Sequence, residues 1–184
     1  MTQQRKNFNR AYKINQATVK EETRPYLDLI SFRNGYVYAT DTHIIVKAKI
    51  KDISNFTDDE LELLEGKSIS SSSFRKLLDF DEVAITPTGF IANGGNGNKT
   101  NFLFNDQQIV DIKFDDVFVG LTDHYAEEKY LFGLNASLLK KASQILGVKG
   151  TMKFEIFKGE KFVVTDPYNV DVDIKCLIMG AYIS

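Results

Sequence analysis

The 184-residue sequence has one cysteine, two histidines and no tryptophan. With only Cys176, His43 and His124 available, one chain can form neither a disulfide framework nor a cysteine/histidine zinc cluster. No apolar run reaches the roughly 18 residues of a membrane helix, and the first ten residues lack the apolar core of a signal peptide. These absences predict a cytoplasmic protein in a reducing compartment, with no membrane contact, no metal and no other cofactor.

The residues that are present can build a core, because 43% of the chain is apolar. The length suits one ordinary domain or two small ones. Basic and acidic side chains nearly balance, 23 against 25, for a net charge of -2. Any contact with nucleic acid must therefore come from local segregation of charge.

One pattern, a helix followed by strand-like runs, recurs three times, over about residues 8–51, 66–105 and 129–182. Helical spacing of apolar residues predicts helices over residues 7–20, 71–80 and 135–147. Asn135 is the expected N-cap of the last helix and Gly147 its stop. Thr57 and Glu60 have capping-box spacing, which predicts a short acidic connecting helix. Asn34-Gly35 predicts a hairpin turn.

Basic residues collect on the outer face of each predicted helix. One such pair alone is typical of the polar face of an amphipathic helix. Because the face is basic in all three, a surface lined by the three helices would attract phosphates without reading bases. The residues predicted to contact phosphate are Lys6, Arg10, Lys13, Lys20, Arg75, Lys76, Lys140 and Lys141, and the resemblance given below implies that the phosphates are those of DNA.

Motifs typical of enzymes are weak in this sequence. The stretch "NGGNGNKT" over residues 93–100 resembles a phosphate-binding loop, but asparagines stand where that loop needs glycines, so a hairpin loop is favoured. The acidic residues over 58–65 scatter around a helix, and the serines over 71–73 have no histidine nearby. His124 is interpreted as a loop histidine. No titratable groups converge by spacing, and we predict no catalytic residues.

The segment "VYATDTHIIV" over residues 37–46 resembles the bacterial β sliding clamp family, which carries a turn of the form Ala-Thr-Asp-Gly-His-Arg-Leu. Ala39, Thr40, Asp41 and His43 match it. The stretches "GKSISSSSFRKLLDF", "DIKFDDVFV", "LFGLNASLLKKASQILG" and "CLIMGAYIS" are similar to further parts of the same family, so the resemblance covers nearly the whole chain.

The resemblance implies an α+β fold of repeated βαβββ half-domains, with helices on one face of antiparallel sheets and around duplex DNA. Residues 1–107 would form a complete clamp-like domain of two half-domains, 108–128 a connector, and 129–184 a second, half-size domain. A lone half-domain leaves a sheet edge unpaired, which predicts a homo-oligomer.

The family docks short partner peptides in an apolar pocket, and the resemblance places that pocket between two segments of this chain. Its predicted residues are Thr40, Thr42, His43, Ile45, Asp115, Val119, Ile178, Met179 and Gly180. Four positions depart from the family: Thr42 replaces glycine, Ile44 replaces arginine, and Asp115 and Gly180 replace prolines.

Two functions remain open from the sequence. The first is a sliding clamp-like processivity or tethering factor of DNA replication, which binds duplex DNA non-specifically and recruits polymerase or repair proteins through a short peptide. The alternative is a monomeric peptide-binding or regulatory module that is derived from a clamp and does not encircle DNA. An enzyme is the third and least supported class.

Overall fold

The computed structural model describes residues 6–94, 97–105, 114–119, 132–157 and 161–182. His124 and most of the predicted connector lie outside these residues. The helices are η1 Ile14–Ala17, η2 Pro25–Asp28, α1 Ile50–Ile53, α2 Asp58–Glu62, α3 Ser71–Leu77, α4 Phe114–Val119 and α5 Ala136–Leu146, η1 and η2 being 3-10 helices. The strands are β1 Leu29–Arg33, β2 Tyr36–Thr40, β3 Ile44–Lys49, β4 Ser68–Ser70, β5 Glu82–Thr86, β6 Gly89–Asn93, β7 Lys99–Leu103, β8 Phe132–Gly133, β9 Lys153–Phe157, β10 Lys161–Thr165, β11 Ile174–Met179 and β12 Ala181–Tyr182.

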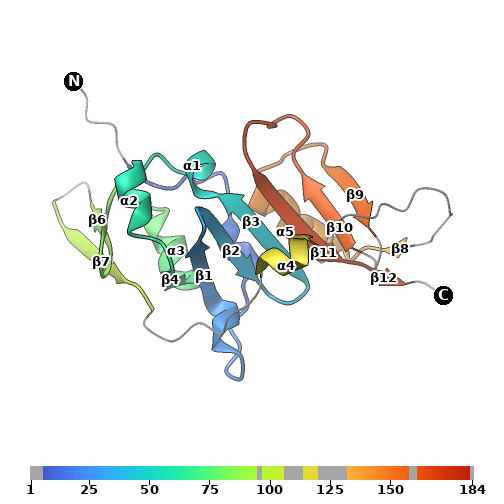
Figure 1. Cartoon of the computed structure of the whole chain (residues 1–184), viewed down its shortest axis with the longest axis horizontal. Coiled ribbons are helices and arrows are strands. Elements are labelled where there is room, and N and C mark those ends of the chain that lie inside the picture. The colour runs from blue at the N-terminus through green and yellow to red at the C-terminus, as the bar shows by residue number, and fades with distance from the viewer. Residues whose placement is uncertain (1–5, 95–96, 106–113, 120–131, 158–160, 183–184) are drawn as a thin grey trace.

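A seven-stranded antiparallel sheet joins the first and last thirds of the chain, in the order β4-β1-β2-β3-β11-β10-β9 (Figure 1). The join is the pairing of β3 with β11, in which Ile44 lies opposite Ile178 and Ile45 opposite Leu177. Strands β5, β6 and β7 form a separate sheet, and β8 pairs with β12. The two predicted domains therefore share one sheet, while their boundaries remain a prediction.

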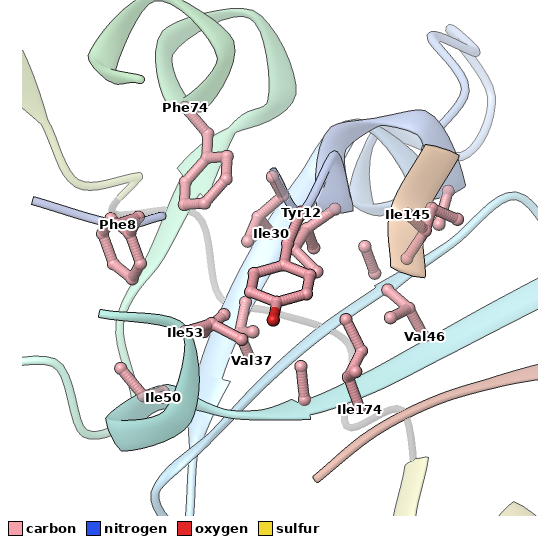
Figure 2. Close-up of a cluster of buried hydrophobic side chains, with 14 of the residues drawn as sticks. Phe8, Tyr12, Ile30, Val37, Val46, Ile50, Ile53, Phe74, Ile145 and Ile174 are labelled. Atoms are coloured by element: carbon pink, nitrogen blue, oxygen red, sulfur yellow. The ribbon is translucent and has the colours of Figure 1, made fainter. Parts of the chain in front are cut away.

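The core lies on the face of the large sheet that α3 and α5 cover. Val46 and Ile174 of paired strands meet Ile145 of α5, and Phe74 of α3 packs against Phe8 (Figure 2). Buried Cys176 belongs to this core, where burial raises the pKa of its thiol and keeps it neutral. The side chains of β5, β6 and β7 complete the same apolar cluster.

Helices α2 and α5 confirm the predicted caps. Asn135 accepts a hydrogen bond from the Ser137 N–H, and Gly147 ends α5 in the left-handed conformation, with φ +69°. Thr57 and Glu60 form the capping box of α2. The Asn34-Gly35 turn also forms, with φ +51° and +75°. In the described part of the chain, no helix is long and apolar enough to cross a membrane.

The predicted helix over residues 7–20 is wrong: only the 3-10 turn η1 forms there. Phe8 instead bridges Ser54 in antiparallel fashion. Asparagine side chains explain the difference, because they offer backbone groups an alternative to helical hydrogen bonds. Asn7 Oδ1 accepts from the Phe8 N–H at 2.7 Å, and Asn9 Oδ1 accepts from the Ala11 N–H at 3.0 Å. The basic residues predicted to lie along one face of this helix are therefore not on a helix.

Candidate functional site

The turn between β2 and β3 is built by the side chains of Thr40 and Asp41. The Thr40 hydroxyl donates to the Ile44 carbonyl at 2.9 Å and accepts from the Thr42 N–H at 3.0 Å. Asp41 Oδ1 accepts from the N–H groups of His43 and Ile44, each at 3.0 Å. Four polar contacts thus fix the corner that presents Thr42 and His43 to solvent.

Thr42 holds a backbone conformation that favours glycine, with φ +77°. For a β-branched residue the left-handed region costs about 1–2 kcal/mol. The resembled family has glycine at this position. The turn therefore keeps the conformation expected of glycine while it carries an exposed threonine side chain.

Asp41 also connects the turn to helix α5. Its side chain is only 6% exposed, and Oδ2 pairs with Lys141 Nζ. Lys141 was predicted to contact DNA, but the structure directs its ammonium to this buried carboxylate. A buried carboxylate needs such partners, because it has left its hydration shell.

His43 and Met179 lie side by side at one end of the β3–β11 pair. The Met179 N–H donates to the His43 carbonyl at 3.3 Å, and the Met179 side chain is 43% exposed. Thr42 and His43 are exposed as well, whereas Thr40 is buried. Gly180, which follows Met179, is partly exposed. The structure therefore brings the predicted turn and C-terminal residues together.

The apolar part of this surface differs from the prediction at one position. Ile45 packs with Leu177 and with Val117 and Phe118 of α4, on the sheet face opposite α5. Ile178 points the other way, into the main core, and is fully buried. The alternation of side chains along β11 is the signal that distinguishes Leu177 from Ile178.

Helix α4 lies across this outer face of the sheet (Figure 1). Asp115 accepts from the Tyr38 hydroxyl at 2.6 Å and from Lys47 Nζ at 2.7 Å, and Phe114 stacks on the Tyr38 ring at 4.9 Å. The Lys47 hydrogen bond lowers the pKa of Asp115, and burial raises the pKa of Tyr38. Asp115 thus anchors α4, with its side chain 45% exposed.

A hollow of about 390 Å³ opens beside α4, lined by Asn34, Tyr36, Tyr38, Lys47, Asp115 and Phe118. Lys47 Nζ lies over the Tyr36 ring at 4.4 Å from its centroid. Among the residues whose side chains the structure describes, Asp115 is the only predicted pocket residue on its wall. The backbone alone of Val119 is described, and it ends α4.

The predicted DNA-binding residues fall into two groups. Lys6 pairs with Glu60 at 2.8 Å, Arg10 with Asp81 at 2.7 Å, and Lys141 with Asp41. The others are exposed, and within the described ranges they form no ion pair: Lys13, Lys20, Arg75, Lys76 and Lys140. The described residues also contain no group of three or more His, Cys, Asp or Glu placed to hold a metal ion.

No protein-family model and no curated protein matches the sequence. Solved structures do match. The DNA polymerase III β subunit of Thermotoga maritima has a TM-score of 0.60 at 12% identity, over 95% of this chain and 62% of that chain. The Helicobacter pylori β clamp bound to a DNA ligase peptide has a TM-score of 0.59 at 13% identity, over 93% and 62%. The Bacillus subtilis DNA polymerase sliding clamp has a TM-score of 0.60 at 13% identity, over 95% and 61%.

The chain spans less than two thirds of the length of these structures. Nearly all of it is covered in each comparison, so the likeness includes the sheets and the helices that pack on them. The predicted clamp-like α+β fold is confirmed. This chain has the fold of the bacterial DNA polymerase III β subunits over less than two thirds of their length.

Proposed function

We propose that the protein is a clamp-like tethering factor of DNA replication that binds duplex DNA non-specifically and docks partner peptides. The observation that carries the proposal is the clamp fold with exposed cations on α3 and α5 that have no ion pair among the described residues; the two helices cover the same face of the sheet. Such cations attract phosphates without reading bases. In this proposal the protein acts by binding and has no catalytic activity. It works on DNA in the cytoplasm.

Neutralising Arg75, Lys76 and Lys140 together should weaken retention of duplex DNA. Each lost phosphate contact lowers the slope of log affinity against log salt by about one. We therefore expect the Arg75→Gln, Lys76→Gln, Lys140→Gln variant to have a visibly shallower salt dependence than the parent chain. Fluorescence anisotropy with a labelled duplex, from low to physiological salt, measures it.

A matched control is Lys49→Gln with Lys175→Gln, two exposed lysines on the opposite face of the sheet. This control should leave the salt slope unchanged. Equal slopes for the triple variant and the control would contradict binding through the helix face. Absence of any DNA retention at low salt would contradict the proposal as a whole.

Partner docking is proposed at the exposed end of the β3–β11 pair, where His43 and Met179 meet. The Helicobacter pylori structure with a similar fold holds a DNA ligase peptide. We expect His43→Ala with Met179→Ala to weaken capture of a short glutamine-containing peptide ending in leucine and phenylalanine about tenfold or more. Titration of the labelled peptide measures the affinity.

Tyr168→Ala is the control for peptide docking, because Tyr168 is 80% exposed and lies on the loop between β10 and β11. Its replacement should not change the affinity. If the His43 and Met179 variant binds the peptide as tightly as this control, the docking site is elsewhere.

The alternative, a monomeric peptide-binding module, is favoured by one observation: three of the eight predicted DNA contacts are engaged in ion pairs. Self-association is instead favoured by β9, an edge strand of the large sheet, on which Phe154 and Ile156 are 39% and 36% exposed.

Light scattering with and without duplex DNA distinguishes a monomeric module from a self-associating clamp-like protein. A monomer that captures peptide but never DNA supports the module.

A further inference from the structure

Strand β9 forms one end of the seven-stranded sheet (Figure 1). All five of its residues pair with β10, and in the described part of the chain no strand lies on its other side. A strand in this position presents backbone N–H and C=O groups that can pair with one further strand. β9 is therefore a place where another chain can add to the sheet.

Other sheet edges carry features that discourage such pairing. β4 has three residues, and the Asn105 N–H donates to its Ser68 carbonyl at 2.8 Å. The edge strand β7 begins with three exposed polar residues, Lys99, Thr100 and Asn101. Short, covered or polar edges resist the addition of a strand. β9 has five residues and exposes two large apolar side chains, so it is the better site for pairing.

Phe154 and Ile156 continue the apolar face of the sheet to its edge. They lie opposite Val164 and Phe162 of β10, which belong to the main core. Opposite residues of an antiparallel pair point to the same face, so both side chains lie on the face that α5 covers. They are nevertheless 39% and 36% exposed. A neighbouring strand with apolar residues on the same face would remove this surface from water.

Lys153 and Glu155 alternate with these residues and point to the outer face of the sheet. Glu155 lies opposite Val163, which packs with Leu177 on that face. Lys153 Nζ lies 3.3 Å from Glu155 Oε1 within the strand. β9 thus carries a positive and a negative side chain two positions apart. An antiparallel copy of the same strand presents the two charges in reverse order and complements them.

We propose that β9 pairs with β9 of a second copy of this chain, antiparallel and centred on Phe154. In this register each Lys153 lies opposite Glu155 of the other copy, and Phe154 lies opposite its own counterpart. Met152, which packs against the main core, lies opposite Ile156. Such a two-fold, self-complementary contact is the usual form of a homodimer.

Other registers of the same pairing are less favourable. A register centred on Glu155 or on Lys153 sets like charges directly opposite each other, which is destabilising. A shift by one residue sets the apolar face of one copy beside the charged face of the other. The register centred on Phe154 avoids both faults. It also keeps the helix-covered faces of the two copies on the same side, so that the exposed cations of α3 and α5 in both copies point the same way.

The inference goes beyond the proposed function, because β9 pairing needs neither duplex DNA nor a peptide. One short strand buries less than the roughly 800 Å² per partner of a standard interface, so we expect a dissociation constant of about 0.01–1 mM. At about 1 µM the chain is then monomeric, and denaturation at that concentration measures the stability of the fold alone.

Sedimentation equilibrium without DNA, from about 1 µM to 1 mM chain, tests the pairing. The parent chain should form dimers as its concentration rises. Lys153→Glu and Glu155→Lys should each weaken dimerisation about tenfold or more, because each sets like charges opposite each other at two places. An equal mixture of the two variants should dimerise again, since every glutamate then faces a lysine. Lys175→Glu is the control, an exposed lysine two strands away on β11, and should dimerise as the parent chain does.

Phe154→Cys measures the register directly. Opposite residues of an antiparallel pair have Cα atoms about 4.5–5.5 Å apart, which suits a disulfide. The natural Cys176 is buried. Mild oxidation should therefore convert Phe154→Cys into a covalent dimer on a non-reducing gel. Ile156→Cys is the matched control, because its two copies would lie about 14 Å apart along the paired strands, too far for a bridge.

Three results would overturn the inference: a parent chain that stays monomeric at about 1 mM, unchanged dimerisation of Lys153→Glu, or no recovery when the two charge variants are mixed. Equal cross-linking of the Phe154→Cys and Ile156→Cys variants would overturn it as well. Circular dichroism checks that each variant is folded. None of these measurements contains DNA or peptide, so their failure is distinct from failure of the proposed function.

Discussion

Phe8→Ala should lower the free energy of unfolding by about 3–5 kcal/mol, the usual cost of deleting a buried phenylalanine ring. The Phe8 side chain is 3% exposed. Its ring lies 6.1, 5.2, 5.0 and 6.0 Å from those of Phe32, Phe56, Phe74 and Phe90. These rings come from β1, the segment before α2, α3 and β6, so one truncation loosens contacts among four parts of the fold. Urea denaturation measures the change.

Phe154→Ala is the matched control, because Phe154 is 39% exposed on the edge strand β9. Its truncation should cost less than about 1 kcal/mol, since little contact area is lost. A Phe8→Ala variant as stable as this control would show that the N-terminal segment is not part of the folded core. A large difference establishes that the segment contributes stability although it forms no α-helix.

Local signals predicted the elements whose stability is mostly local. Helix α5 has an asparagine cap, an apolar face at helical spacing and a glycine stop, and the structure has all three. The hairpin at Asn34-Gly35 follows from two residues that tolerate positive φ. The predicted helix over residues 7–20 does not form because the side chains of Asn7 and Asn9 accept from backbone N–H groups of this segment, and tertiary contacts of Phe8 then decide the conformation.

The sequence pattern could not predict which distant strands pair with one another. Nothing local to β3 or β11 specifies that these strands pair, yet this pairing creates the large sheet and brings His43 next to Met179. The resemblance to clamps predicted that the turn residues lie near the C-terminal residues. It did not predict which side chains of β11 point to which face of the sheet. Leu177 therefore lies where Ile178 was expected, because only alternation along the paired strand fixes which side chain points outward.

For the basic residues too, the sequence pattern predicted which side chains are exposed but not which of them form ion pairs. Periodicity identified the exposed cations of α3, Arg75 and Lys76, correctly. It could not show that Lys141, one position after Lys140 on α5, finds a carboxylate 100 residues away. Which cations stay free for phosphate depends on such pairings, so a count of basic residues overestimates the available surface.

Lys141→Met should lower the free energy of unfolding by about 2–3 kcal/mol, because it leaves the buried Asp41 charge without its ammonium partner. Asp41 keeps two backbone donors, from His43 and Ile44, and this limits the loss. Urea denaturation measures it. Lys140→Met on the same helix is the control; Lys140 is exposed and within the described residues has no ion pair, so its cost should stay within about 0.5 kcal/mol.

A double-mutant cycle separates the buried charge from lost packing of the lysine stem. Asp41→Asn removes the charge but keeps an oxygen that can accept from the His43 and Ile44 N–H groups. Adding Lys141→Met to Asp41→Asn should therefore cost less than adding it to the parent chain, by about 1 kcal/mol or more. Additive costs would mean that the ammonium does not stabilise the carboxylate. Non-additive costs would mean that α5 holds the strained Thr42 turn in place, and with it the His43–Met179 end of the sheet.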